Sequence, residues 1–150
     1  MNLSIIHIVQ PNLVGKLKML EHEIDQELLA EVKERMELIT YKGKEILYEN
    51  YTNLNGEQIS IRVPIFSHLE LNMGKKDMLL IIDLSNSFAN KGAVSAFTEA
   101  GKVTGHLFPK TAVLGITGVK KILLNVVNRL TQVNAKPFSD IEGAKEYLIK

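Results

Sequence analysis

Apolar side chains recur at steps of three and four residues in the first part of the chain, between Leu13 and Val32. Charged residues fill the remaining positions, so the pattern predicts an amphipathic helix. The helix either packs on its own domain or pairs with a second copy as a short coiled coil, making a homodimer. A seam of only about three heptads favours the first arrangement. The apolar positions are Leu17, Leu20, Ile24, Leu28 and Val32.

Two β-rich runs, residues 36–41 and 44–51, follow and are joined through Gly43. Short runs of this kind separated by a glycine turn predict a β-hairpin at the front of the domain.

Residues 57–73 fit two patterns. Alternating apolar residues after the turn-like pair Asn55-Gly56 are typical of a strand, whereas Ile59, Val63, Phe66 and Met73 lie on one face of a helix. We favour the helix, and we expect it to begin late or to kink at Pro64, because proline is tolerated only in a first turn.

The second half of the chain alternates strands and helices. Residues 78–84 and 112–116 are short, nearly continuous apolar runs, typical of central strands covered on both faces. Helical stripes follow at 93–104 and 119–133, then a short edge strand at 135–138 and a last helix through Leu148.

This alternation predicts parallel strand pairs with right-handed crossovers. We therefore expect an α/β fold, a small, mostly parallel sheet of four to five strands with an N-terminal β-hairpin and packed helices. Residues 1–35 form an N-terminal extension, mainly the amphipathic helix, and residues 36–150 form the α/β domain.

Ligands of such sheets bind beyond the carboxyl ends of the strands, where the loops 85–92 and 117–121 are expected. Hydroxyl and amide side chains there either bind a ligand or partner, or simply cap the following helix. Capping is the simpler interpretation for each residue alone, and core packing is the simpler one for Phe88. The candidate binding residues are Ser85, Asn86, Ser87, Phe88, Asn90, Lys91, Thr117, Gly118, Lys120 and Lys121.

The turn at Gly118 places two lysines at the start of a helix. Free backbone N–H groups there would hold an anion, but the spacing does not match a phosphate-binding P-loop. A solvated turn is the simpler interpretation.

Composition excludes several classes of protein. Lys and Arg total 18 against 17 for Asp and Glu, and this near-balance argues against a nucleic-acid partner. The absence of cysteine excludes disulfides, thiolate nucleophiles and cysteine–metal sites. There is no apolar run long enough for a transmembrane segment and no leader pattern, so we expect a cytoplasmic protein.

Catalytic signals are weak. The four histidines are scattered without metal-ligand spacing, and Asp83, at the end of a buried strand, has no partner carboxylate. Its role is more simply capping than acid–base chemistry. We therefore predict no catalytic residues, no metal and no cofactor, and a protein that is not an enzyme.

Four segments, residues 41–48, 82–88, 112–122 and 136–138, resemble the STAS-like family. This group is related to bacterial anti-sigma-factor antagonists and is sometimes linked to CRAL-TRIO lipid carriers. The resemblance covers residues 36–150 and implies a four- or five-stranded sheet with packed helices. It also favours the helix at 57–73 and a regulatory or ligand-sensing module.

Anti-sigma-factor antagonists carry an Asp-Ser-Ser-Gly segment whose serine a partner kinase phosphorylates. The corresponding stretch here is Ala89-Asn90-Lys91-Gly92, which has no hydroxyl group, so the resemblance carries over no phosphorylation acceptor.

Two functions follow as expectations. The first is a non-enzymatic regulatory module that binds a protein partner, a regulator or kinase, through the loop 85–91 and the adjoining helix. The second is a carrier or sensor of a small apolar or anionic, lipid-like ligand held between the two loops, with Lys120 or Lys121 binding an acidic head group.

Overall fold

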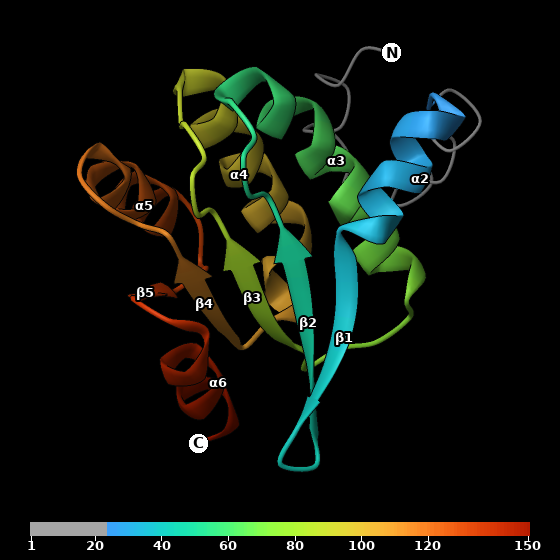
Figure 1. Cartoon of the computed structure of the whole chain (residues 1–150), viewed down its shortest axis with the longest axis vertical. Helices are drawn as coiled ribbons and strands as arrows, with labels where there is room; N and C mark the ends of the chain where they lie inside the picture. The colour runs from blue at the N-terminus through green and yellow to red at the C-terminus, as the bar shows by residue number, and fades with distance from the viewer. Residues whose placement is uncertain (1–23) are drawn as a thin grey trace.

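The structure, a computed structural model, describes residues 24–150 and is built on one five-stranded sheet in the order β1-β2-β3-β4-β5 (Figure 1). The first two strands form an antiparallel hairpin, and every later pairing is parallel. This arrangement confirms the predicted fold class. The strands are β1 (Met36–Tyr41), β2 (Lys44–Asn50), β3 (Leu79–Asp83), β4 (Lys110–Leu114) and β5 (Ala135–Phe138).

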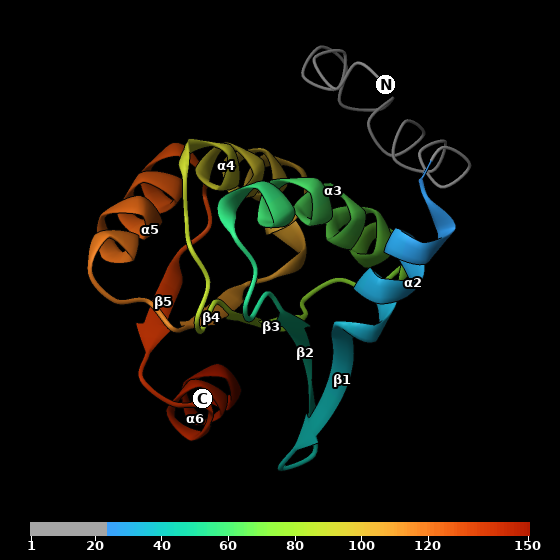
Figure 2. The same cartoon turned by 45° about the horizontal axis from the view of Figure 1, so that its top comes forward.

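Helices lie on both faces of the sheet (Figure 2). Three of them, α3 (Gly56–Asn72), α4 (Lys91–Thr104) and α5 (Val119–Leu130), cover one face. The last helix, α6 (Ile141–Ile149), packs on the other face, and α2 (Gln26–Glu34) leads into β1. A short 3₁₀ helix, η2 (Gly105–Leu107), follows α4.

Alternation along β3 explains why its residues 79–82 are all apolar. Ile81 packs against Ala144 and Leu148 of α6, whereas Leu80 and Ile82 pack on the opposite face. Because both faces are covered, these positions of the strand need apolar side chains.

The segment after residue 55 is helical, as favoured above, but the expected late start is wrong. The helix α3 begins at Gly56 because Asn55 Oδ1 accepts from Gln58 N and Gln58 Oε1 accepts from Asn55 N, both at 2.8 Å. This capping box takes the place of a hairpin turn. Gly56 is needed because a Cβ there would lie 2.2 Å from Cγ of Asn90.

A continuous helix through Ile24 is also wrong. Asp25 Oδ1 accepts from Glu27 N at 2.8 Å and from Leu28 N at 3.3 Å, so α2 begins at Gln26. The predicted helical positions Leu17 and Leu20 lie outside the described residues.

Helix α2 contributes to the main apolar core. Leu29 and Val32 are buried together with Tyr51 and Val63, and Leu28 packs partly against the same cluster. The boundary at residue 35 and a homodimer through the N-terminal helix stay predictions. No helix among residues 24–150 has the length and apolarity that crossing a membrane requires.

Removing the cap of α3 should destabilise the fold without changing it. Replacing Asn55 by alanine leaves the Gln58 N–H without its acceptor, which should lower the free energy of unfolding by about 1 kcal/mol. Asn55→Ser, which restores an acceptor, should recover most of that loss. Urea denaturation of both variants tests this, and equal stability of Asn55→Ala and wild type would contradict the role of the cap.

Candidate functional site

The loops that follow β3 and β4 lie side by side at one edge of the sheet. Leu84 N donates to Leu114 O at 2.9 Å, and Lys120 Nζ donates to Leu84 O at 3.2 Å and to Ser87 O at 3.3 Å. Gly115 has φ +79°, and a Cβ there would lie 2.4 Å from Ser85 N. The two loops expected to share a rim are therefore in direct contact.

Several candidate side chains of this rim are used by the turns themselves. Ser87 is buried and its hydroxyl donates to Leu84 O at 2.6 Å. Asn90 caps α4 by accepting from Ala93 N at 2.8 Å, and the backbone N–H of Ser85 donates to Asp83 Oδ1 at 3.0 Å. The bond from Ser85 agrees with the expected capping role of Asp83, which also accepts from the Tyr48 hydroxyl at 2.5 Å.

The remaining candidates face outward. The Phe88 side chain is 74% exposed, so core packing, the simpler interpretation, is wrong for it. The other exposed candidates are Asn86, Lys91, Thr117, Gly118 and Lys121.

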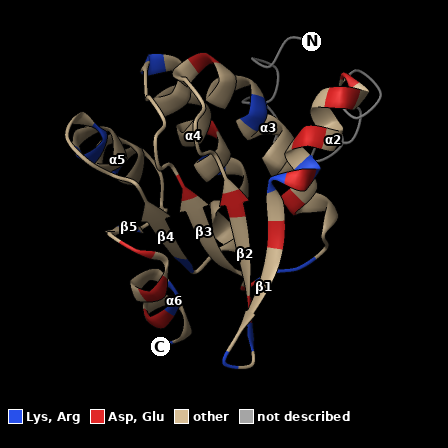
Figure 3. Cartoon of the chain, in the orientation of Figure 1, with Lys and Arg blue, Asp and Glu red and all other residues tan. Residues whose placement is uncertain are grey.

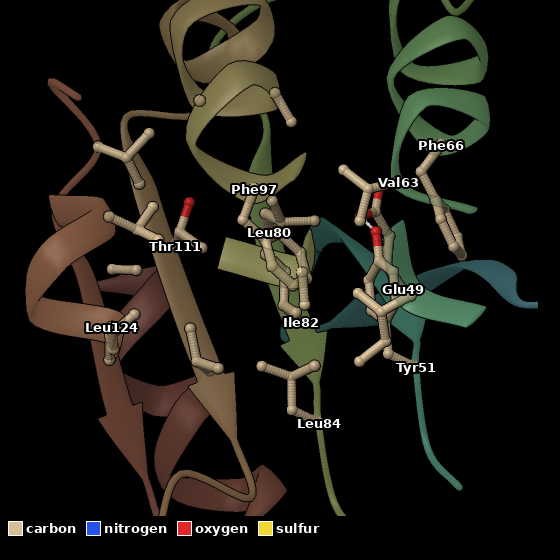
Figure 4. Close-up of a pocket in the computed structure, with 18 of the residues that line it drawn as sticks. Glu49, Tyr51, Val63, Phe66, Leu80, Ile82, Leu84, Phe97, Thr111 and Leu124 are labelled. Atoms are coloured by element: carbon tan, nitrogen blue, oxygen red, sulfur yellow. Dashed lines mark hydrogen bonds between the residues drawn. The ribbon is translucent and has the colours of Figure 1, made fainter. Parts of the chain in front are cut away.

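Beneath the rim, an apolar cavity of about 110 Å³ lies between the sheet and helices α3, α4 and α5 (Figure 4). Its lining comes mostly from alternate positions of the strands and from the helices above them. Figure 4 shows Thr111 and Leu124 at one end and Glu49 and Tyr51 at the other. The packing of these elements therefore leaves an apolar interior space that has Glu49 and Tyr51 at one end.

Two carboxyl groups form that polar end. Glu49 extends from β2 and Glu70 from α3, and their side chains are only 2% and 4% exposed. The Tyr51 hydroxyl lies 3.5 Å from Glu49 Oε1. No donor among residues 24–150 reaches Glu49 Oε2. Figure 3 shows the acidic position near the end of β2.

Burial governs the electrostatics of this pair. Removal from water raises the pKa of Glu49 well above its usual range, and the neighbouring Glu70 charge raises it further. Burial also raises the pKa of Glu70, although hydrogen bonds with Glu49 and Thr104 partly offset the rise. Because two adjacent buried carboxyls do not both ionise readily, the pair tends to retain a proton.

The arrangement can accept hydrogen bonds or hold a positive charge at one end of an apolar space. Among the described residues, no group of three His, Asp or Glu side chains is placed to bind a metal ion. Lys120 is the one basic side chain that the described residues contribute to the lining, and its Nζ already donates to two carbonyl groups.

Neither carboxylate was among the predicted site residues. The sequence did contain a signal: Glu70 falls on the helical face defined by Ile59, Val63 and Phe66. Glu49 likewise falls between Leu47 and Tyr51 at alternate positions of a strand. An acidic residue in an apolar stripe indicates a buried acidic side chain, and no sequence motif is needed to recognise it.

Comparison with known proteins supports the fold. No protein-family model matches the sequence, and no curated protein matches it significantly. A solved structure from Shewanella loihica PV-4, an uncharacterised protein of the DUF3478 family with a SpoIIAA-like fold, is similar with a TM-score of 0.58 and 16% identity. The match covers 75% of this chain and 91% of that one.

The chain therefore has a SpoIIAA-like fold, which is the STAS-like fold expected from the sequence. SpoIIAA itself is an anti-sigma-factor antagonist. At 16% identity the likeness concerns the fold alone.

Glu49→Gln should change how stability depends on pH. In the wild type, the raised folded-state pKa means that the folded chain binds more protons than the unfolded chain. Stability should therefore fall as the pH rises from the unfolded pKa, roughly 4.3, through the folded-state pKa. The variant should match wild type near pH 4 and be more stable at pH 8 by about 1–3 kcal/mol.

Chemical denaturation at both pH values measures this difference. Glu45→Gln, an exposed position on the same strand, is the matched control and should follow the wild type. A Glu49→Gln variant that loses stability at pH 8 would show that the ionised carboxylate stabilises the fold.

Proposed function

We propose that the chain is a non-enzymatic, cytoplasmic binding module whose cavity takes a small apolar ligand, as a carrier or sensor. The observation that carries the proposal is the cavity of about 110 Å³ beneath the rim. Most of its wall consists of aliphatic and aromatic side chains, including Val63, Phe97 and Leu124. Apolar cavities of this kind bind small apolar molecules when the ligand replaces empty space with contacts.

The size of the cavity sets the size of the ligand. An apolar cavity of about 150 Å³ holds benzene, so this one of about 110 Å³ suits a ligand of about that size or slightly smaller. The lining reaches Ser87 and Lys120 of the two loops, but the Lys120 ammonium group donates to the carbonyl groups of Leu84 and Ser87 instead of facing a ligand head group. These contacts favour an apolar ligand over an anionic one.

Helix α5 offers the means of entry. It has no fully buried residue, and Val119 and Ile122 on its outer side are exposed. A helix held by so few buried contacts separates from the sheet at lower cost than α3 or α4.

Filling the cavity should weaken ligand binding. We expect 1-pentanol to cause saturable NMR shifts at the lining residues of the full chain. Leu124→Phe should weaken that binding by about fivefold or more, because the larger ring occupies the space. Ile122→Phe, an exposed position on the same helix, should bind as wild type does. Absence of saturable shifts in the wild type would overturn the proposal.

A second candidate is the protein partner expected from the sequence. Phe88 is exposed beside the contact of Lys120 with Ser87, and Val119 is exposed next to Lys120. Exposed apolar groups ringed by polar ones are typical of protein interfaces. The sequence favours the protein partner as the first function. Here the small ligand comes first, because the sequence does not reveal the cavity.

Substitutions on the loop 85–91 test this second function. Phe88→Ser, and separately the Asn90→Asp, Lys91→Glu double variant, should lose a partner that the wild type recovers by pull-down from its source cell. Aspartate is also a good helix cap, so the double variant keeps α4 intact. Ile61→Ser, exposed on α3, is the control. Normal recovery by both loop variants would overturn the loop assignment.

A further inference from the structure

The polar end of the cavity contains an acceptor without a donor. Glu49 is 2% exposed, lines the cavity, and has one carboxylate oxygen that no donor among the described residues reaches. Figure 4 shows its side chain at the end of the cavity beside Tyr51, below Val63 of α3. An unpaired acceptor in such a place costs free energy, and a ligand that supplies a donor recovers it.

Among the residues that the structure describes, Lys120 is the only cation in the lining of the cavity. The groups that influence the pKa of Glu49 and Glu70 are each other, Tyr51 and Thr104, and none of them is a cation. The basic group in the described lining, Lys120, donates to carbonyl groups of the rim. Ionisation of either carboxyl would place a negative charge in apolar surroundings with no cation beside it among the described residues.

An anionic head group would add a second negative charge to this end and is disfavoured. A neutral hydroxyl group would supply one donor and no charge. An ammonium group supplies three donors and the missing positive charge. The apolar walls at Leu80, Ile82 and Phe97 would then contact the hydrocarbon part of the same molecule.

We propose that the cavity selects small primary amines with an apolar tail, and that Glu49 and Glu70 together bind the ammonium group. This inference rests on the proposed function, because it names the class of ligand for the same cavity. It replaces the anionic head group expected from the sequence with a cationic one. The two carboxyls act as ligand-binding residues and not as catalytic ones.

Three ligands with five carbon atoms each test the selectivity. NMR titration of the full chain near neutral pH with n-pentylamine, 1-pentanol and pentanoate should rank the amine first, by about tenfold or more over the alcohol. Pentanoate should bind most weakly of the three. The shifts should centre on residues that line the cavity, among them Tyr51, Phe66 and Phe97.

Glutamine variants, which keep the size of the side chain, show which residues cause the selectivity. Glu49→Gln with Glu70→Gln should bind 1-pentanol as wild type does and lose the preference for n-pentylamine. Each single variant is made as well, so that a folding failure of the double variant leaves the test intact. Glu45→Gln with Glu57→Gln removes exposed carboxylates from the same strand and helix and should keep the preference.

The outcomes separate the two proposals. If none of the three ligands binds, the proposed apolar site is wrong, and the amine selectivity is wrong with it. If 1-pentanol binds as tightly as n-pentylamine, or pentanoate binds more tightly, the cavity remains a binding site and only the inferred class of ligand is wrong. If the preference for the amine survives in the Glu49 and Glu70 variants, the carboxyl pair is not its cause.

Discussion

The parallel register of β2, β3 and β4 is the constraint on which both the rim and the cavity depend. Tyr51 N donates to Asp83 O and Leu84 N donates to Leu114 O, each at 2.9 Å, so the three strands end at the same level. The loops that follow are thereby brought together at one edge. The same register places Glu49 beside Ile82, within the sheet face that α3, α4 and α5 cover.

The interior of that face combines two opposing tendencies. Its aliphatic and aromatic walls gain free energy by leaving water, whereas Glu49 and Glu70 lose free energy by the same burial. Residues of similar volume without charge would stabilise the fold more. A buried acidic pair beside an apolar cavity therefore lowers the stability of the fold. Locally destabilising features of this kind are common at functional sites.

The fold could be read from the sequence because its signals are local or periodic. The apolar run at residues 78–84 indicated a strand covered on both faces, and the stripe at residues 119–133 indicated a helix, which ends at Leu130. The predicted starts of α2 and α3 were wrong for the same reason. Asn55 and Asp25 cap helices through side-chain contacts with backbone N–H groups two or three residues later. Asn and Asp also favour turns, so their presence alone does not distinguish a helix cap from a turn.

The order of residues alone determined the α/β class, the hairpin at its start and the edge where the loops meet, because periodicity and strand direction follow from the chain itself. Only the tertiary structure decided which polar residues serve the turns and which face a cavity. Glu49 and Glu70 stand 21 positions apart in the sequence. They meet because α3 crosses back over β2, and the cavity that they border is the space left unfilled where α3, α4 and α5 pack on the sheet.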